Sequence, residues 1–149
     1  MKLIRGVTVH QPWAWCISMA AVDPERYKRI ENRTWAPRNH VGHYLAIHAG
    51  KRVDDTAWEM IREIAPEIWL PKVAELELGA IVAVCRLARV IEDQLQAPES
   101  QRRWLFGPKG WLLEDVRMID PVPCRGAQGL WELPPLVYGQ VRSNWLKGK

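Results

Sequence analysis

The sequence predicts a single α+β domain over residues 1–149, built on a curved mixed barrel. Two observations predict this fold class. Six segments show the alternation or the short apolar run that is typical of strands, whereas only three show the pattern of a helix. Three helices are too few to cover both faces of a doubly wound parallel sheet, so a curved mixed sheet is favoured. The length also suits one domain with one core.

The first half of the chain is predicted to contain three strands and two helices. Pro12 stands near the first turn of the first helix, where the N–H group that proline lacks has no partner in any case. Asp54 and Asp55 open the second helix, where negative charge is favoured. In order, the predicted elements are a strand at 3–9, a helix at 12–21, strands at 28–35 and 43–48, and a helix at 54–65.

The second half is predicted to contain three strands and the third helix. Its first strand is the most apolar run of the chain and is therefore expected at the centre of the sheet. Gly126 and Gly129 interrupt the last strand. In order, the predicted elements are a strand at 79–91, a polar loop at 92–103, a tight turn at 107–110, strands at 111–119 and 122–133, and a terminal helix at 134–147.

The composition, 48% hydrophobic and 26% charged, is that of a soluble globular protein, and no apolar run is long enough to span a membrane. The first seven residues are too short for a signal peptide and contain Arg5, so a cytoplasmic location is expected. Cys16, Cys85 and Cys124 are spaced neither as a disulfide framework nor as a zinc site, which indicates reduced thiols. We expect a monomer with no metal and no cofactor.

The net charge of +4 is unevenly distributed along the chain. Residues 26–52 contain seven basic residues and one acidic residue, whereas residues 54–78 contain seven acidic residues and two basic ones. This pattern favours a positive side of the molecule that attracts a polyanion. The alternative is that both stretches form mixed solvated surface.

Residues 28–35 concentrate opposite charges in a segment that is patterned like a half-buried strand. Side chains two residues apart share one face of a strand, so Glu31, Arg33 and Trp35 are expected on one wall, with Lys28 where the chain enters. Such a wall suits a planar polar ligand, which it could bind by hydrogen bonds and stacking. The alternative is a solvated ion-pair cluster worth about 0–1 kcal/mol per pair.

Five short motifs resemble the ASCH domain, the activating-signal-cointegrator homology family, over residues 4–133. They are His10-Gln11-Pro12-Trp13, Lys28-x-x-Glu31-x-Arg33-x-Trp35, His48-Ala49-Gly50, Gly110-Trp111 and Gln128-Gly129-Leu130-Trp131. The resemblance implies a PUA-like fold, which is a small curved β-barrel with packed helices, related to domains that bind RNA and modified bases.

The signature of that family is Gly-x-Lys-x-x-Glu-x-Arg, which lines a cleft beside the barrel. Carried over to this chain, its charged positions are Lys28, Glu31 and Arg33, while Arg26 occupies the place of its glycine. The resemblance therefore favours a ligand site over an ordinary ion-pair cluster. Lys28 is expected to lie at the cleft mouth, partly exposed.

The first functional interpretation is a binding module for a base or nucleotide, free or within RNA or DNA. Lys28, Arg26 and Arg38 would contact phosphates, Arg33 and Glu31 would contact polar base edges, and a tryptophan would stack on the base. Binding should then weaken as salt rises. The candidate ligand-binding residues are Gln11, Trp13, Arg26, Lys28, Glu31, Arg33, Trp35 and Arg38.

The second interpretation is a hydrolase that acts on a modified nucleoside or on RNA, as the resemblance implies for some relatives. Lys28 and Glu31 would then be the catalytic base and acid. The amidohydrolase relatives have a threonine nucleophile where this chain has Glu31. Thr34 cannot replace it, because it lies on the other face of the predicted strand. We therefore rank binding above hydrolysis.

Overall fold

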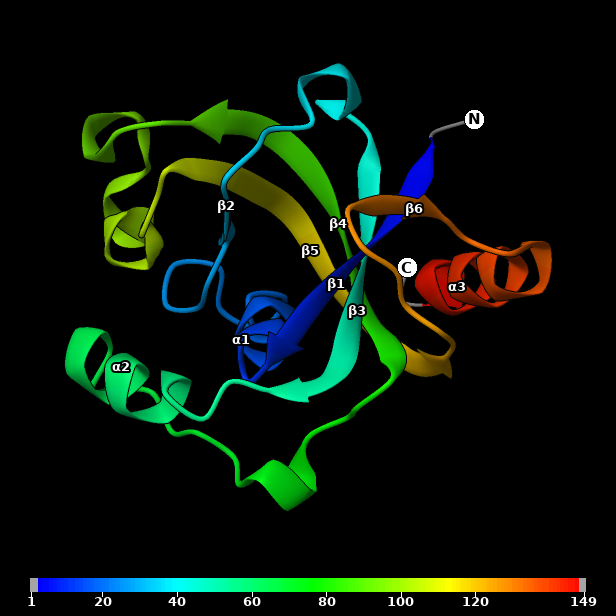
Figure 1. Ribbon diagram of the computed structural model, residues 1–149, viewed down its shortest axis with the longest axis horizontal. Coiled ribbons are helices and arrows are strands. Elements are labelled where there is room, and N and C mark those ends of the chain that lie inside the picture. Colours follow the sequence, from blue (N-terminus) through cyan, green and yellow to red (C-terminus); the bar gives the residue numbers. More distant parts are fainter. Residues whose placement is uncertain (1–2, 148–149) are drawn as a thin grey trace.

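The computed structural model describes residues 3–147 as a six-stranded mixed sheet that curls around its own concave side (Figure 1). The order of the strands across the sheet is β2-β5-β4-β3-β1-β6. Neighbouring strands are antiparallel except for β1 and β3, which are parallel. The strands are β1 (Ile4–Gln11), β2 (Ile30–Arg33), β3 (Tyr44–Val53), β4 (Ala80–Ile91), β5 (Lys109–Pro123) and β6 (Leu130–Glu132).

The sheet is strongly curved but does not close into a barrel. Its two outer strands, β2 and β6, are only four and three residues long, and within residues 3–147 each pairs on one side only. The α+β class and the surrounding helices are confirmed, whereas the expected closed barrel is wrong. Closure requires the two outer strands to pair, and strands this short at opposite ends of the order offer little backbone for it.

Three helices and several 3-10 turns surround the sheet (Figure 1). The helix α1 (Trp13–Met19) packs inside the curve of the sheet, α2 (Ala57–Ile64) lies beyond the end of β3, and α3 (Pro135–Lys147) packs on β5. All three lie within the helices predicted from the sequence. The 3-10 turns are η1 (Arg38–His40), η2 (Val73–Glu75), η3 (Gln94–Gln96) and η4 (Glu99–Trp104).

The predicted central strand is confirmed, because β4 lies between β5 and β3 and its residues 80–85 are all buried. Its side chains contribute to the core on both faces of the sheet. Val82 belongs to the cluster that packs on α1, and Val84 belongs to the cluster under α3. Burial on both faces explains why this segment is a continuous apolar run rather than an alternating pattern.

The strand predicted at 122–133 is wrong. Val122 and Pro123 extend β5, where they pair with the start of β4, and only residues 130–132 form the separate strand β6. The segment between them is a loop. Gly129 in this loop has a backbone φ of +68°, a conformation that most other residues avoid, so the glycine signal marked a loop rather than an interrupted strand.

The cysteines are free thiols, as expected. Cys16 and Cys85 are fully buried and Cys124 is half-buried. Burial raises the pKa of the Cys16 thiol to about 12.

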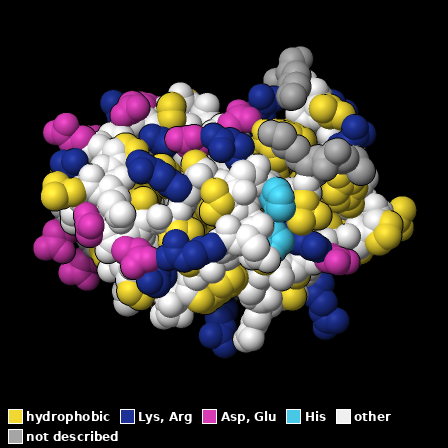
Figure 2. All heavy atoms as spheres, turned by 90° about the horizontal axis from the view of Figure 1, so that it is seen from above, with side chains coloured by type: hydrophobic (Ala, Val, Ile, Leu, Met, Phe, Trp, Pro, Cys, Tyr) yellow, Lys and Arg dark blue, Asp and Glu magenta, His cyan; other side chains and the backbone are white. Residues whose placement is uncertain are grey.

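Among the helices of residues 3–147, none has the length and apolar character that a membrane crossing requires. Seen from above, basic and acidic side chains are interspersed over the surface (Figure 2). The charge separation expected from the sequence is not visible on this face.

Candidate functional site

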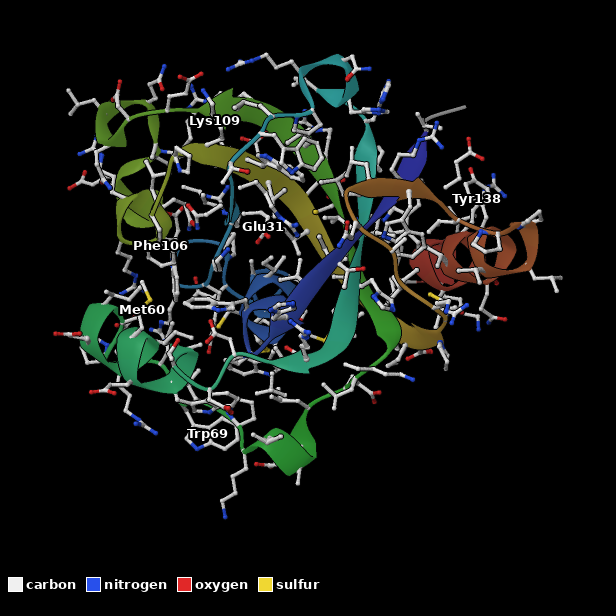
Figure 3. All side chains as sticks on the ribbon, in the orientation of Figure 1. Glu31, Met60, Trp69, Phe106, Lys109 and Tyr138 are labelled. Carbon is white, nitrogen blue, oxygen red and sulfur yellow. The ribbon has the colours of Figure 1, made fainter. Side chains whose placement is uncertain are left out.

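A cleft of about 420 Å³ opens on the concave side of the sheet. Residues of β1 and β2 form one side of it, and the start of α1 forms another. Figure 3 shows Glu31 inside the curve of the sheet, with Met60 of α2 and Phe106 of the segment after η4 further out. The lining residues are Thr8, Val9, His10, Trp13, Lys28, Glu31, Asn32, Arg33, Asp54, Met60 and Phe106.

A chain of three charged groups forms the wall of the cleft on the β2 side. The Lys28 Nζ lies 3.2 Å from Glu31 Oε1, and the Arg33 Nε lies 2.9 Å from Glu31 Oε2. Glu31 and Arg33 share one face of β2, as the period of a strand requires. Each oxygen of the carboxylate therefore accepts a hydrogen bond from a different cation, and the side chain of Glu31 is 10% exposed.

Lys28 is buried, which corrects the expectation of a partly exposed lysine at the cleft mouth. Only 2% of the residue is accessible. Its ammonium group turns inward, where it donates to the backbone oxygen of Ile30 as well as to Glu31 and lies 5.8 Å from the centre of the Trp13 ring. The hydrogen bond to Ile30 holds the ammonium at the floor of the cleft.

Arg33 joins two strands that are far apart in the order of the sheet. Its Nη2 donates to the backbone oxygen of Thr8 on β1 at 2.7 Å, and its guanidinium lies over the ring of Trp111 at 5.6 Å. A guanidinium carries five N–H donors, and the described residues provide acceptors at Nε and Nη2 only. The remaining donors, including both at Nη1, can serve a ligand in the cleft.

Trp13 and Asp54 form the wall on the α1 side. The indole Nε1 of Trp13 donates to Asp54 Oδ2 at 2.9 Å, and the ring meets Phe106 edge-on at 5.6 Å between centroids. The hydroxyl of Thr56, 2.6 Å from Asp54 Oδ1, and the Trp13 indole hold the pKa of Asp54 below its usual value. The cleft thus presents a second carboxylate that is ionised at neutral pH, next to a fixed aromatic ring.

The fold of the chain is similar to crystal structures of a bacterial protein. The ASCH protein from Zymomonas mobilis matches with a TM-score of 0.55 and 14% identity, over 94% of each chain. The chain has the fold of an ASCH domain. Two mutants of the same Zymomonas mobilis protein match equally well, with TM-scores of 0.54 and 0.55 and 14% identity, over 94% of this chain and 96% and 94% of theirs.

The ASCH fold expected from the sequence motifs is therefore confirmed by the structural comparison. No protein-family model matches the sequence. No curated protein matches it either. At 14% identity, the likeness shows the fold alone.

Four of the eight candidate ligand residues line the cleft together, namely Trp13, Lys28, Glu31 and Arg33. Gln11 lies outside the lining and is 2% exposed. Its amide donates to the backbone oxygen of Glu77 at 2.9 Å and accepts from the backbone N–H of Trp15 at 2.8 Å. These bonds tie α1 to the segment before β4.

The other three candidates also lie outside the cleft lining and have partners elsewhere. Trp35 follows the end of β2, and its ring packs against Trp111 at 5.0 Å between centroids. Since β2 ends at Arg33, the strand period no longer places residue 35 on the wall. Arg26 and Arg38 form ion pairs with Asp23 and Glu92.

The cleft also contains residues that the sequence interpretation missed. Asn32 holds the Phe106 segment in place, since its Oδ1 accepts from the backbone N–H of Phe106 at 2.8 Å and its Nδ2 donates to the backbone oxygen of Trp104 at 3.0 Å. Asparagine is depleted in strands, so its position within the predicted strand was the sequence signal that could have pointed to a special role for Asn32. Asp54 was assigned only to a helix N-terminus, and no local pattern places Met60 or Phe106 in a cleft.

Proposed function

We propose that this ASCH-like domain binds a nucleic acid or a modified nucleotide by taking one base into the cleft lined by Trp13, Lys28, Glu31 and Arg33. The observation that carries the proposal is the buried charge chain. Removing two charges from water costs several kcal/mol per ion, and an apolar replacement is often as stable or more stable. Stability alone therefore does not account for these residues, whereas recognition of a polar ligand does.

The charges and shape of the cleft support a base rather than a phosphate. Its lining has two basic residues, Lys28 and Arg33, and two acidic residues, Glu31 and Asp54, so the formal charges balance. The volume of about 420 Å³ is within the range of small-molecule sites. Free guanidinium donors, carboxylate acceptors and an aromatic flank complement the edges and the face of a base.

The hydrolase alternative has less support from the geometry. A general base must reach a proton on the substrate, either directly or through one water. The ammonium of Lys28 is instead turned to Ile30 and Glu31, and the side chain is only 3% exposed. Both oxygens of Glu31 are engaged by cations. We therefore retain hydrolysis only as an outcome that the experiment below detects.

The proposal is tested by comparing two arginines that each pair with a glutamate. Arg33→Met removes the cleft guanidinium, and Arg38→Met removes one that pairs with Glu92 outside the cleft. Purified variants are titrated with modified nucleosides and with labelled short RNA and DNA strands, while products are followed by chromatography. The Arg33→Met variant loses hydrogen bonds to a charged group, worth about 1.5–3 kcal/mol, so it should bind the ligand about 10- to 150-fold more weakly than the wild type.

The Arg38→Met variant should bind within about twofold of the wild type, because Arg38 lies outside the cleft and pairs with Glu92. A twofold change corresponds to less than about 0.5 kcal/mol. Equal affinities of Arg33→Met and the wild type for every bound ligand would remove the cleft from the binding site. Release of a product by the wild type, but not by Arg33→Met, would replace the binding module with the hydrolase.

A further inference from the structure

A second cleft, of about 770 Å³, adjoins the first. The end of β3, Gly79 and the loop after β5 form its walls, with Lys51, Arg52 and Arg125 among the lining residues. Thr8 and His10 line both clefts, so the two adjoin at β1. The pairing of β1 with β3 is irregular between Val9 and Gln11, and such an irregularity redirects the exposed His10 side chain at the junction.

The two clefts differ sharply in charge. The lining of the first has two basic and two acidic residues, as described above. The lining of the second contains Lys51, Arg52 and Arg125 and no acidic residue. A concave surface with one sign of charge concentrates ions of the opposite sign. The second cleft is therefore suited to an anion, whereas the first is not.

The three cations of the second cleft are also free to bind. All three are exposed, and no ion pair or hydrogen bond of their side chains occurs within residues 3–147. By contrast, Arg26, Arg38 and Arg103 on other parts of the surface each lie against a carboxylate. Unpaired exposed cations are common on proteins. Three of them around one hollow without a carboxylate form an anion site rather than ordinary solvated surface.

The floor of the second cleft is firmly built. His48, which is 3% exposed, is hydrogen-bonded to Thr8 Oγ1 at 3.2 Å through Nδ1 and to the backbone oxygen of Cys124 at 2.9 Å through Nε2. Gly126 closes over this pair so tightly that a Cβ atom there would lie 2.5 Å from Thr8 Oγ1 and 2.7 Å from His48 Cε1. These contacts fix the loop that carries Arg125 against β1 and β3.

We propose that the second cleft binds the phosphodiester backbone that flanks the base held in the first cleft, so that the ligand is a single-stranded nucleic acid and not a free nucleoside. The inference rests on the proposed function and adds the class of ligand. A positive groove beside an aromatic base site is the usual arrangement of single-strand binding proteins. The strand passes from one cleft to the other over Thr8 and His10.

The test compares ligands of different length and two matched triple variants. Lys51→Ala/Arg52→Ala/Arg125→Ala removes the cations of the second cleft. Arg62→Ala/Arg142→Ala/Lys147→Ala removes the same charge from exposed residues outside both clefts. Dissociation constants for a nucleoside monophosphate, and for RNA and DNA strands of four and eight nucleotides, are measured between 50 and 200 mM salt.

Wild-type affinity should rise with strand length and fall steeply with salt. Loss of three phosphate contacts should make the salt dependence less steep by about 2, because each contact to a single strand contributes about 0.7 to the slope. Over this fourfold range of salt, the wild type should then lose about 16-fold more affinity than the second-cleft variant. The second-cleft variant should bind the monophosphate with an affinity within about twofold of the wild type. The surface variant should keep the wild-type dependence of strand affinity on salt.

Three results would overturn the inference without touching the proposed function, provided that Arg33→Met still weakens binding. The first is a second-cleft variant whose strand affinity depends on salt as steeply as that of the wild type. The second is a surface variant that loses as much salt dependence as the second-cleft variant. The third is a wild-type affinity that does not rise with the length of the strand. If the wild type bound no modified nucleoside, no monophosphate and no strand, the proposed function and this inference would fail together.

Discussion

Replacing Lys28 and Glu31 singly and together separates the cost of the buried charges from their function. Lys28→Met and Glu31→Leu each exchange a buried charged side chain for an apolar one of similar size. In the wild type the two groups lie 3.2 Å apart, with side-chain exposures of 3% and 10%. The three variants form a double-mutant cycle, which isolates the interaction between the two residues.

The two single variants are expected to differ in stability. Glu31→Leu leaves the Lys28 ammonium buried without a carboxylate, which costs about 3–5 kcal/mol. Lys28→Met leaves Glu31 paired with Arg33 at 2.9 Å, so it should cost only about 1.5–3 kcal/mol, as for one charged hydrogen bond. The double variant buries neither charge and should lie within about 1 kcal/mol of the wild type, or be more stable. The coupling free energy is then at least about 3 kcal/mol.

Urea denaturation measures these free energies, and the nine tryptophans of the chain report the transition by fluorescence. In thermal melts the Glu31→Leu variant should unfold roughly 6–20 °C below the wild type, from about 2–4 °C per kcal/mol. The folded double variant should nonetheless bind no base-containing ligand, because its cleft wall has lost two polar groups.

The reasoning would be refuted if the double variant were as unstable as Glu31→Leu alone, since buried charge would then not be the source of the cost. A double variant that kept wild-type affinity would refute the binding role of the wall. A Glu31→Leu variant with unchanged stability would show that Lys28 reaches water in solution.

Three further predictions concern the core, the second cleft and acid stability. Val82→Asp and Val84→Asp each bury an unpaired charge in the central strand and should abolish soluble expression, whereas soluble, folded wild-type levels of both would contradict the burial of β4. Gly126→Ala forces a Cβ atom against the Thr8–His48 pair, so it should lower the midpoint of urea denaturation and weaken the binding of nucleic-acid strands. An unchanged midpoint would show that the loop moves to accommodate the Cβ atom. The folded pKa of Asp54 is lowered, so this carboxylate stabilises the fold above its unfolded pKa of about 3.9 and the contribution is lost as pH falls through the lowered value. The destabilisation caused by Asp54→Asn, from urea curves, should therefore be larger at pH 7 than at pH 3, and a difference independent of pH would exclude this linkage.

Most of the fold could be predicted from local patterns, because helices and strands leave different periods in the sequence. The central strand β4 and the helix α3 follow directly from an apolar run and from a proline start. Closure of the sheet could not be predicted, since it depends on the lengths of β2 and β6. The strands predicted at 28–35 and 122–133 are both longer than these two strands. Element boundaries are set by tertiary pairing more than by composition.

The site was predictable only where its residues are close in sequence. Glu31 and Arg33 share a strand face, so their pairing follows from a period of two. Asp54 meets Trp13 across 41 positions of the chain, and Phe106 reaches the cleft through Asn32 across 74 positions. No local pattern reports such contacts. The exposure of Lys28 was misjudged for the same reason, because its cover comes from Trp13 on another element.

The hydrogen bonds of Trp13 and Lys28 give the two clefts different stiffness, and this difference has a consequence for how a ligand is captured. The indole of Trp13 and the ammonium of Lys28 are already held in place, so a base that enters loses little further side-chain entropy. Lys51 and Arg125 are instead exposed, and ordering each side chain on a ligand costs about 0.5–1.5 kcal/mol. If the two clefts bind as proposed, discrimination between ligands belongs to the rigid first cleft. On the same proposal, we expect the exposed cations of the second cleft to raise the rate of encounter, because long-range attraction acts before any contact is formed.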